Sequence, residues 1–273
     1  MIRTIYRACR SVYRCYIGYP LATRHCVGRL LRKGLITHVH YKKGEVNFNY
    51  GSATGLKARS FPHSDLHVLQ QIILEEEYGF AVRWIKAKGL DLSALRIVDA
   101  GANVGYTSIY FLSFFPQASL LAIEPDPANF KVLEQNLSCS GTAQVPRAIQ
   151  AALLAQSGLS VMIDRQGGDK KDWSFTVRPS NAVEGILSVS VQDLLQQTGW
   201  PRIDILKIDI EGSEADVFSE QADLRYLSVV RILLIEIHDD MADRKLIHRL
   251  LIQNGFEVVE RSETTFAINK AFN

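Results

Sequence analysis

The segment VDAGANVGYTS, residues 98–108, decides the fold class of this 273-residue chain. An apolar run enters a glycine-bearing turn, and a helix-forming run leaves it. Gly101 and Gly105 can adopt positive φ angles and let the backbone approach a ligand closely. The free N–H groups at the start of the next helix suit an anionic group, and Asp99 could accept a hydrogen bond from an ammonium. The pattern predicts a nucleotide-type cofactor loop at the end of a strand.

A second predicted strand ends in AIEPDP, residues 122–127, which places Glu124 19 residues after Gly105. An acidic side chain at this point can accept hydrogen bonds from both hydroxyls of a ribose. NAD domains favour GxGxxG, because the second glycine lets the pyrophosphate approach. Asn103 and Tyr106 occupy the second and third glycine positions here. The loop therefore fits S-adenosylmethionine, which has no pyrophosphate, better than NAD.

Strand and helix patterns alternate along most of the chain, which is typical of an α/β fold with a parallel sheet. The expected strands are residues 96–100, 120–123, 148–153, 203–208 and 230–237, and the expected helices are 104–115, 126–137, 193–198, 213–220 and 241–254. Residues 256–260 and 264–269 are expected to close the sheet as an antiparallel pair. Residues 159–192 predict an irregular β-rich excursion with a turn at Gly167-Gly168.

The N-terminal part follows a different pattern. Residues 36–50 predict a hairpin with its turn at Lys43-Gly44, and residues 65–88 predict a helix. The first 35 residues predict basic helices interrupted at Pro20. We place a domain boundary near residue 65, with residues 1–64 as a basic N-terminal extension and residues 65–273 as the main domain.

Two later strands carry charges that are unusual in a buried sheet. They lie in ILKIDIEGSE, residues 205–214, and in IEIHDD, residues 235–240. The charged members are Lys207, Asp209, Glu211, Glu236 and His238. Such charges are costly unless they are paired or belong to a solvated site, and ligands bind at the carboxyl ends of parallel strands. We expect a functional site here, with Lys207 and Glu236 as candidates for a buried pair.

Together these motifs resemble the FkbM-type methyltransferase family over roughly residues 75–270. The resemblance implies a class I, Rossmann-like α/β fold with a seven-stranded sheet flanked by helices. It also implies that the chain binds S-adenosylmethionine and transfers a methyl group, usually to a hydroxyl oxygen. Family members often act on sugars or natural products, so we expect a small-molecule or glycan acceptor. Residues 1–65 and most of 159–187 lie outside the resemblance.

The resemblance also implies roles for individual residues. The implied cofactor-binding residues are Asp99, Gly101, Asn103 and Gly105 for the methionine part, Glu124 for the ribose and Ala151 near the adenine. Asp209 and Glu211 would line the methyl-transfer site. Tyr78 is a candidate to close over the cofactor. Trp173 could stack on an acceptor, although such residues more often anchor a loop.

Transfer to an alcohol releases a proton, so a general base is expected. Asp209 and His238 are the candidate bases, because both are predicted at the ends of adjacent strands and histidine titrates near neutral pH. We assign these two residues and Glu211 as catalytic. The structural alternatives are a helix N-cap for Asp209, a surface histidine, and a helix-start carboxylate for Glu211. Asp239 and Asp240 could join them as metal ligands, but the spacing matches no metal motif, and we assign no metal.

The charge of the chain is unevenly distributed. Residues 1–44 hold ten Lys or Arg and no Asp or Glu, so they carry +10 and the remainder carries −8 of the net +2. Residues 1–35 are expected to form a solvated or packed cap that could contact an anionic membrane surface. No basic stripe continues along the rest of the chain, so the sequence does not favour binding of nucleic acid.

Several protein classes find no support in the sequence. No apolar run reaches the roughly 18–20 residues that cross a bilayer, and arginines interrupt the pattern of a signal peptide. The four cysteines have no metal-site spacing, which indicates reduced thiols in a cytoplasmic protein, peripheral at the membrane if the basic segment binds there. Two alternatives stay open: an NAD-dependent oxidoreductase and a non-catalytic methyltransferase-like binding module. Nothing in the sequence indicates an oligomeric state.

Overall fold

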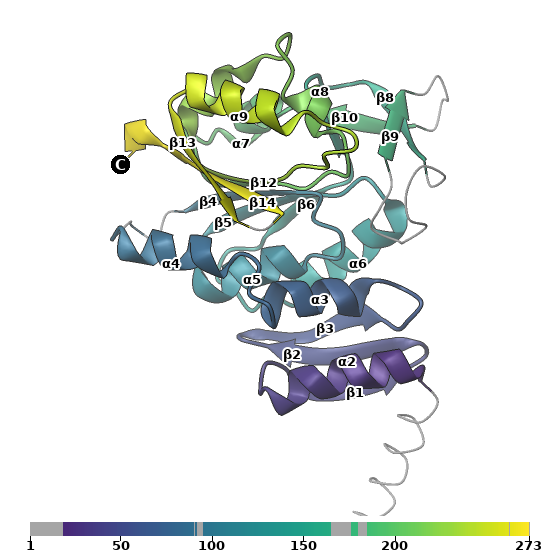
Figure 1. Cartoon of the computed structure of the whole chain (residues 1–273). Coiled ribbons are helices and arrows are strands. Elements are labelled where there is room, and N and C mark those ends of the chain that lie inside the picture. The colour runs from purple at the N-terminus through teal and green to yellow at the C-terminus, as the bar shows by residue number, and fades with distance from the viewer. Residues whose placement is uncertain are drawn as a thin grey trace, which may run out of the picture.

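The described part of the chain forms a central seven-stranded sheet, an N-terminal three-stranded sheet and a small four-stranded sheet (Figure 1). The computed structural model describes residues 19–89, 91, 95–164, 176–179, 185–261 and 263–272. Trp173 and the expected Gly167-Gly168 turn lie outside the described residues, as does the chain before residue 19. Among the helices that are described, none is long and apolar enough to cross a membrane.

The central sheet has the order β13-β14-β12-β11-β4-β5-β6. Its strands are β4 (Arg96–Ala100), β5 (Ser119–Ile123), β6 (Arg147–Ile149), β11 (Ile203–Ile208), β12 (Val230–Glu236), β13 (Phe256–Arg261) and β14 (Thr264–Asn269). β14 runs antiparallel to both of its neighbours, whereas the other adjacent pairs are parallel. The expected seven-stranded sheet and its closing antiparallel pair are therefore confirmed.

Helices cover both faces of this sheet. They are α3 (Asp65–Ile73), α4 (Gly79–Ala87), α5 (Tyr106–Phe114) and α6 (Pro127–Ser138) on one side, and α7 (Val191–Thr198), α8 (Glu214–Val217) and α9 (Arg244–Gln253) on the other (Figure 1). Alternate strand residues enter opposite cores: on β12, Ile232 and Leu234 join the first, and Leu233 and Ile235 join the second. Each such burial contributes about 1.5–3 kcal/mol. This two-sided packing explains why the strands are apolar throughout.

Capping side chains define where two of the expected helices begin. Asp126 accepts hydrogen bonds from the N–H groups of Ala128 and Asn129, and Pro127 follows at the first helical position of α6. Ser190 caps α7 by accepting the N–H of Asp193. These capping signals can be read from the sequence, and both helices begin within two residues of the expected first residue.

The N-terminal sheet packs onto the helical layer of the main sheet. It consists of β1 (Thr37–Lys42), β2 (Glu45–Tyr50) and β3 (Ala53–Arg59), with α2 (Leu21–Arg32) beginning directly after Pro20 (Figure 1). The predicted hairpin turn at Lys43-Gly44 is confirmed, while β3 was not expected. Phe48 is 1% exposed, and its ring lies 6.2 Å from the ring of Tyr106 on α5. One continuous hydrophobic core thus joins this sheet to the main one.

Two expected elements are wrong in detail. The single helix expected over residues 65–88 is two helices, α3 and α4, because the chain turns between them at Glu76, which has a φ of 52°. The strand expected over residues 148–153 is also divided. β6 ends at Ile149, and β7 (Ala152–Leu153) pairs instead with a strand of the small sheet.

The small sheet is the β-rich excursion that the sequence predicted. Its order is β7-β10-β8-β9. The remaining strands are β8 (Ser160–Asp164), β9 (Thr176–Pro179) and β10 (Ile186–Val189). It lies beside the carboxyl ends of the central strands, so it can contribute a wall to a site there (Figure 1).

Candidate active site

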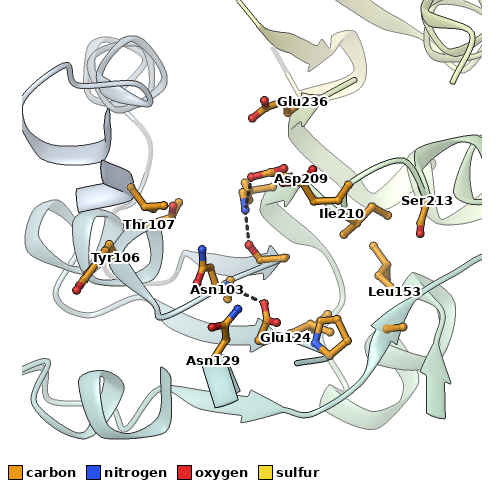
Figure 2. A pocket seen from close by; sticks show the side chains of 18 of the residues that line it. Asn103, Tyr106, Thr107, Glu124, Asn129, Leu153, Asp209, Ile210, Ser213 and Glu236 are labelled. Atoms are coloured by element: carbon orange, nitrogen blue, oxygen red, sulfur yellow. Dashed lines mark hydrogen bonds and ion pairs between the residues drawn. The ribbon is translucent and has the colours of Figure 1, made fainter. Parts of the chain in front are cut away.

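A cavity of about 270 Å³ lies at the carboxyl ends of β4, β5, β11 and β12. Seven of the nine site residues expected from the sequence line it: Gly101, Asn103, Glu124, Ala151, Asp209, Glu211 and His238. Asp99 and Gly105 are not among the lining residues. Figure 2 shows Asn103, Asn129 and Glu124 gathered at one end of the cavity, and Asp209 with Glu236 toward the other. The tertiary structure therefore brings most of the predicted site together.

The glycine loop passes very close to the end of β11. Gly101 has a φ of 74°, and a Cβ on this residue would overlap the backbone carbonyl of Asp209. Gly105 has a φ of 92° and caps the start of α5, where an added Cβ would lie 2.8 Å from Leu133 Cδ1 of α6. Gly101 therefore shapes the cavity directly, whereas Gly105 serves the packing of α5 on α6.

Glu124 and Asn103 form a polar end that fits a ribose. The carboxylate of Glu124 accepts the N–H of Asn103 at 2.8 Å and the N–H of Asp126 at 2.9 Å. Burial raises the pKa of Glu124 to about 7, although these two N–H groups oppose the shift. The side-chain oxygen of Asn103 is buried and has no hydrogen-bond partner among the described residues. An unsatisfied acceptor in a cavity wall calls for a ligand donor such as a hydroxyl or an ammonium.

An apolar wall stands beside this polar end. Ile123 and Pro125 flank Glu124, and Ala151 and Leu153 face the same cavity from the segment after β6. Ala151 is 4% exposed and lies at the point where the chain leaves the central sheet for β7. A flat adenine ring would find apolar contacts here, so the residues present fit an adenosyl cofactor.

Lys207 ties the glycine loop to β11 from below the cavity. Its buried ammonium lies 3.3 Å from the Asp99 carboxylate and 3.4 Å from that of Asp209. It also donates to the backbone carbonyls of Ala100 and Gly101. Within the described residues its ion pairs are with these two aspartates, and the expected pair with Glu236 is wrong. Burial lowers the pKa of Lys207, but the charges of Asp209 and Asp99 outweigh burial and raise it, so the ammonium stays charged.

This arrangement changes what Asp99 can do. Its carboxylate is fully buried, accepts the hydroxyl of Ser108 at 2.7 Å and faces Lys207. The ammonium that Asp99 meets therefore belongs to the protein itself. Asp99 thus holds Lys207 and, through it, the carbonyls of Ala100 and Gly101 in the glycine loop.

His238 is held between two carboxylates. Its Nε2 lies 3.3 Å from Glu211, and its Nδ1 lies 3.1 Å from Glu214, the first residue of α8. Burial alone would lower the pKa of His238, but the hydrogen bonds to Glu211 and Glu214 raise it to about 11. The ring is therefore an imidazolium at neutral pH. An imidazolium has no free lone pair, so it cannot accept a proton.

Further carboxylates face the same space. The charge of Asp209, followed by burial, raises the pKa of Glu236 to about 8. Burial raises the pKa of Glu211 and of Glu77, which enters from the turn between α3 and α4. This end of the cavity is therefore rich in acidic groups, and part of that set is protonated near neutral pH.

The sequence prediction missed several lining residues. They are Val68, Gln71, Ile72 and Glu77 from α3 and the following turn, Thr107 from α5, Asn129 from α6 and Ser213 after β11. Tyr78, the aromatic candidate in EEEYGF, does line the cavity and is 2% exposed. The acidic residues that precede Tyr78 were the one local sign of a site in this segment. The lining residues of α3 reach the cavity only through tertiary packing, which the local sequence does not indicate.

The strand order, the glycine loop after β4 and the carboxylate ending β5 define a class I methyltransferase, whose cofactor is S-adenosylmethionine. The profile of the family described as the methyltransferase FkbM domain matches residues 99–258, which is more than half of the chain. The chain belongs to this family. Its membership confirms the resemblance seen in the sequence and decides for S-adenosylmethionine over NAD.

Two of the similar curated proteins are named as methyltransferases. Methyltransferase sdnD of Sordaria araneosa is 28% identical over 197 residues, which cover 61% of this chain and 76% of that protein. The 2-O-methyltransferase NoeI of Sinorhizobium fredii (strain NBRC 101917 / NGR234) is 27% identical over 208 residues, covering 71% and 75%. The solved structure of Methyltransferase FkbM from Methylobacillus flagellatus KT aligns with a TM-score of 0.40 and 14% identity, over 64% of this chain and 44% of that one.

Proposed function

We propose that this methyltransferase transfers the methyl group to a hydroxyl oxygen of a sugar, glycan or natural-product acceptor. The observation that carries the proposal is the Asp209 carboxylate, which lines the cavity beside the glycine loop with 27% of its side chain exposed. A hydroxyl nucleophile needs a proton acceptor, whereas a neutral amine does not need one before it attacks. The relative NoeI, named as a 2-O-methyltransferase, supports the same acceptor atom.

S-adenosylmethionine supplies a methyl group that its positive sulfur has already activated. The protein has to hold an acceptor oxygen in line with that carbon, about 3 Å away. Bound S-adenosylmethionine would supply the methyl group to that oxygen and would keep the electron pair of the broken C–S bond on sulfur. We assign Asp209 to take the hydroxyl proton, since its carboxylate is accessible and Lys207 holds it from below.

His238 and Glu211 then act as positioning residues. His238 keeps its proton at neutral pH, so the alternative of His238 as the base is set aside in favour of Asp209. The imidazolium instead orients Glu211 and, through Glu214, the turn that follows β11. Asn103, Glu124 and Ala151 are assigned to the cofactor, with Asp99, Gly101 and Gly105 shaping the loop that holds it.

Product analysis on an acceptor panel tests this proposal. Purified protein is incubated with labelled cofactor and sugars, phenols and amines, and the methylated atom is located by NMR. We expect O-methylation, with Asp209→Asn retaining adenosylhomocysteine affinity while turnover falls about 10²–10⁴-fold. Methyl groups found only on nitrogen or carbon, or full activity in Asp209→Asn, contradict it. Cofactor binding without transfer to any acceptor favours the non-catalytic binding module.

Membrane contact through residues 1–35 belongs to the same proposal. In the described part of this segment, α2 buries Cys26, Val27 and Leu30 and exposes Arg29, Arg32 and two leucines. A basic and apolar outer face suits an anionic lipid surface. Co-sedimentation with anionic liposomes should exceed that with neutral liposomes, and Arg29→Gln with Arg32→Gln should reduce it. Equal sedimentation with both lipids contradicts membrane contact.

A further inference from the structure

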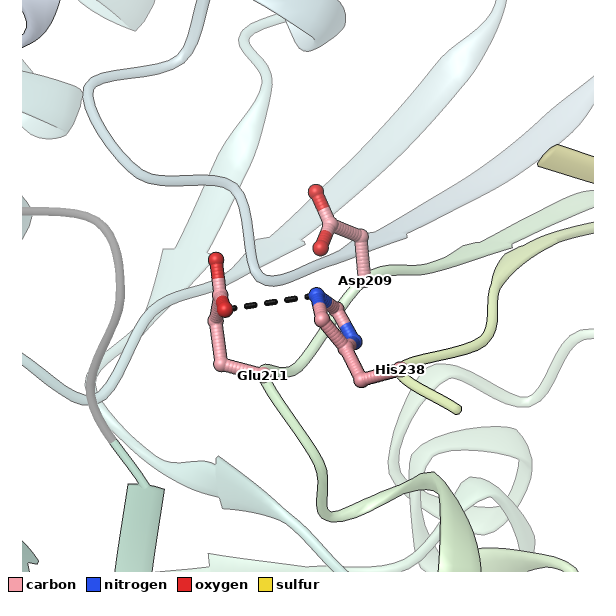
Figure 3. Close-up of side chains that lie close together, drawn as sticks. All are labelled: Asp209, Glu211 and His238. Atoms are coloured by element: carbon pink, nitrogen blue, oxygen red, sulfur yellow. Dashed lines mark ion pairs between the residues drawn. The ribbon is translucent and has the colours of Figure 1, made fainter. Parts of the chain in front are cut away.

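Three side chains of metal-binding type converge at the acidic end of the cavity. Asp209 and Glu211 follow β11, and His238 follows β12. One ligand atom from each lies within 4.8 Å of the other two, and Figure 3 shows the three groups pointing toward a shared space. Ligand atoms on opposite sides of a cation with bonds of about 2.1 Å lie about 4.2 Å apart. Small side-chain rotations would therefore bring this set to bonding distance.

A fourth residue fixes the orientation of the histidine. The carboxylate of Glu214 is fully buried and accepts the N–H groups of Ile210 at 3.1 Å and Gly212 at 2.8 Å. It therefore presents an anchored acceptor to Nδ1 of His238. When Nδ1–H donates to Glu214, Nε2 is the nitrogen that faces Glu211 and the cavity. A cation would bind there by displacing the Nε2 proton that the two glutamates hold in the metal-free protein, so binding should release a proton. Metal-binding histidines are characteristically oriented in this way by a carboxylate on their other ring nitrogen.

The charge around the cavity also calls for a cation. Glu77 and Glu236 add two further carboxylates to the same lining. The two cationic groups do not balance them, because the Lys207 ammonium is shared between Asp99 and Asp209 and the His238 imidazolium between Glu211 and Glu214. Like charges held close together in a partly buried site repel strongly. A divalent cation between Asp209 and Glu211 would offset that repulsion.

We propose that Asp209, Glu211 and His238 bind a divalent transition-metal cation of the manganese type. One imidazole nitrogen with two carboxylate oxygens suits first-row transition metals, whereas magnesium and calcium prefer all-oxygen sites. Three protein ligands leave positions open for other oxygens. Binding itself does not depend on the proposed function. The use of the cation, which is to hold an acceptor hydroxyl and lower its pKa beside Asp209, rests on that function.

Manganese binding to the full chain tests the site directly. The protein is stripped with a chelator and dialysed, and free Mn²⁺ is followed by electron paramagnetic resonance during titration. We expect one Mn²⁺ per chain. Asp209→Asn, Glu211→Gln and His238→Gln should each weaken the affinity by about tenfold or more. Asp240→Asn is the matched control, because this exposed carboxylate is two residues from His238 and outside the cluster.

Adenosylhomocysteine calorimetry on the same samples separates the outcomes. A wild-type protein that binds adenosylhomocysteine but no Mn²⁺ at millimolar concentration overturns the site and leaves the proposed O-methylation intact. Variants that bind Mn²⁺ like the wild type overturn it as well. A variant that also loses adenosylhomocysteine affinity has altered the shared cavity and no longer isolates the metal ligand, so the other variants then carry the test. The proposed O-methylation is tested separately, by locating the methyl group in the product.

Discussion

At the scale of single residues, the shape and charge of the cavity depend on two positions, Gly101 and Glu124. Gly101 lies where the loop after β4 crosses the end of β11, and no side chain fits between them. Glu124 is a buried carboxylate in the cavity wall, held by the N–H groups of Asn103 and Asp126. Both residues are stabilised in unfavourable states by the surrounding fold, as is common at functional sites.

Gly101→Ala should disrupt both stability and cofactor binding. A non-glycine residue at this φ costs about 1–3 kcal/mol, and overlap with the Asp209 carbonyl adds to that cost. Gly158→Ala is the matched control, since Gly158 has a φ of 78° but nothing within 4 Å of an added Cβ. Chemical denaturation and adenosylhomocysteine calorimetry measure the two effects. Equal losses in both variants would show that the close crossing has no role.

Glu124 should make cofactor affinity depend on pH. Its pKa is raised to about 7, so this group favours folding most below its ordinary pKa and loses that contribution as pH rises through about 7. The affinity for the cofactor should change with pH in the opposite direction and rise as pH rises, because the ionised carboxylate is the better acceptor for ribose hydroxyls. Adenosylhomocysteine affinity should fall by up to about tenfold from pH 8 to pH 6.

Two variants assign that pH dependence to its source. Glu124→Gln should bind more weakly and lose the dependence between pH 6 and 8. Glu236 has a raised pKa of about 8 and titrates in the same range, so Glu236→Gln should keep the dependence. If instead Glu236→Gln abolishes it, the ribose assignment of Glu124 loses its support.

At the scale of elements, a buried ion pair joins three of them. Arg59, the last residue of β3, makes a bidentate contact with Asp65 at the start of α3. The same guanidinium donates to Asn129 of α6, which lines the cavity. The Asp65 side chain is fully buried, so removing one partner of this ion pair should be costly.

Asp65→Ala should therefore destabilise the protein by about 3–5 kcal/mol, because it removes the buried carboxylate that the Arg59 guanidinium contacts. Glu45→Ala offers the comparison: Glu45 pairs with Lys57 at 3.7 Å, and both side chains are at least one-third exposed. Such exposed pairs contribute about 0–1 kcal/mol. Urea denaturation compares the two variants, and a small effect of Asp65→Ala would mean that β3, α3 and α6 are held by apolar packing alone.

At the scale of the whole molecule, the N-terminal sheet and the methyltransferase sheet share one hydrophobic core. Phe48 and Leu56 from the first lie in the same cluster as Ile205 and Leu234 from the second. The hydroxyl of Tyr106, on the helix after the glycine loop, donates to the carbonyl of Lys57 on β3. The N-terminal sheet therefore supports the helix that positions the cofactor loop.

Phe48→Ala should lower the stability of the whole protein by about 3–5 kcal/mol, because the lost ring leaves a cavity in this shared core. We expect a single unfolding transition. The free energy of opening measured by hydrogen exchange should fall by the same amount in β11 as in β2. Two separate transitions, with β11 protection unchanged, would show instead that the N-terminal sheet unfolds as an independent unit and would support a domain boundary at residue 65.

The sequence alone determined the elements whose signals are local. The strand–glycine–helix run at residues 98–108, the cap at Asp126 and the closing antiparallel pair were all predictable, because turn chemistry and alternation act over a few residues. The same signals identified nine site residues, seven of which line the cavity, since the ends of parallel strands meet at one edge of the sheet.

Only the tertiary structure decided how the charges are paired. Lys207 pairs with Asp99 and Asp209 rather than with Glu236. His238 lies between Glu211 and Glu214, which raise its pKa. Strand register and the path of the α3–α4 turn bring these groups together from distant parts of the chain. A local hydrophobic pattern predicts which face of a strand is buried, but it does not say which charged side chains of distant segments meet, so pairing and protonation could be assigned only from the folded molecule.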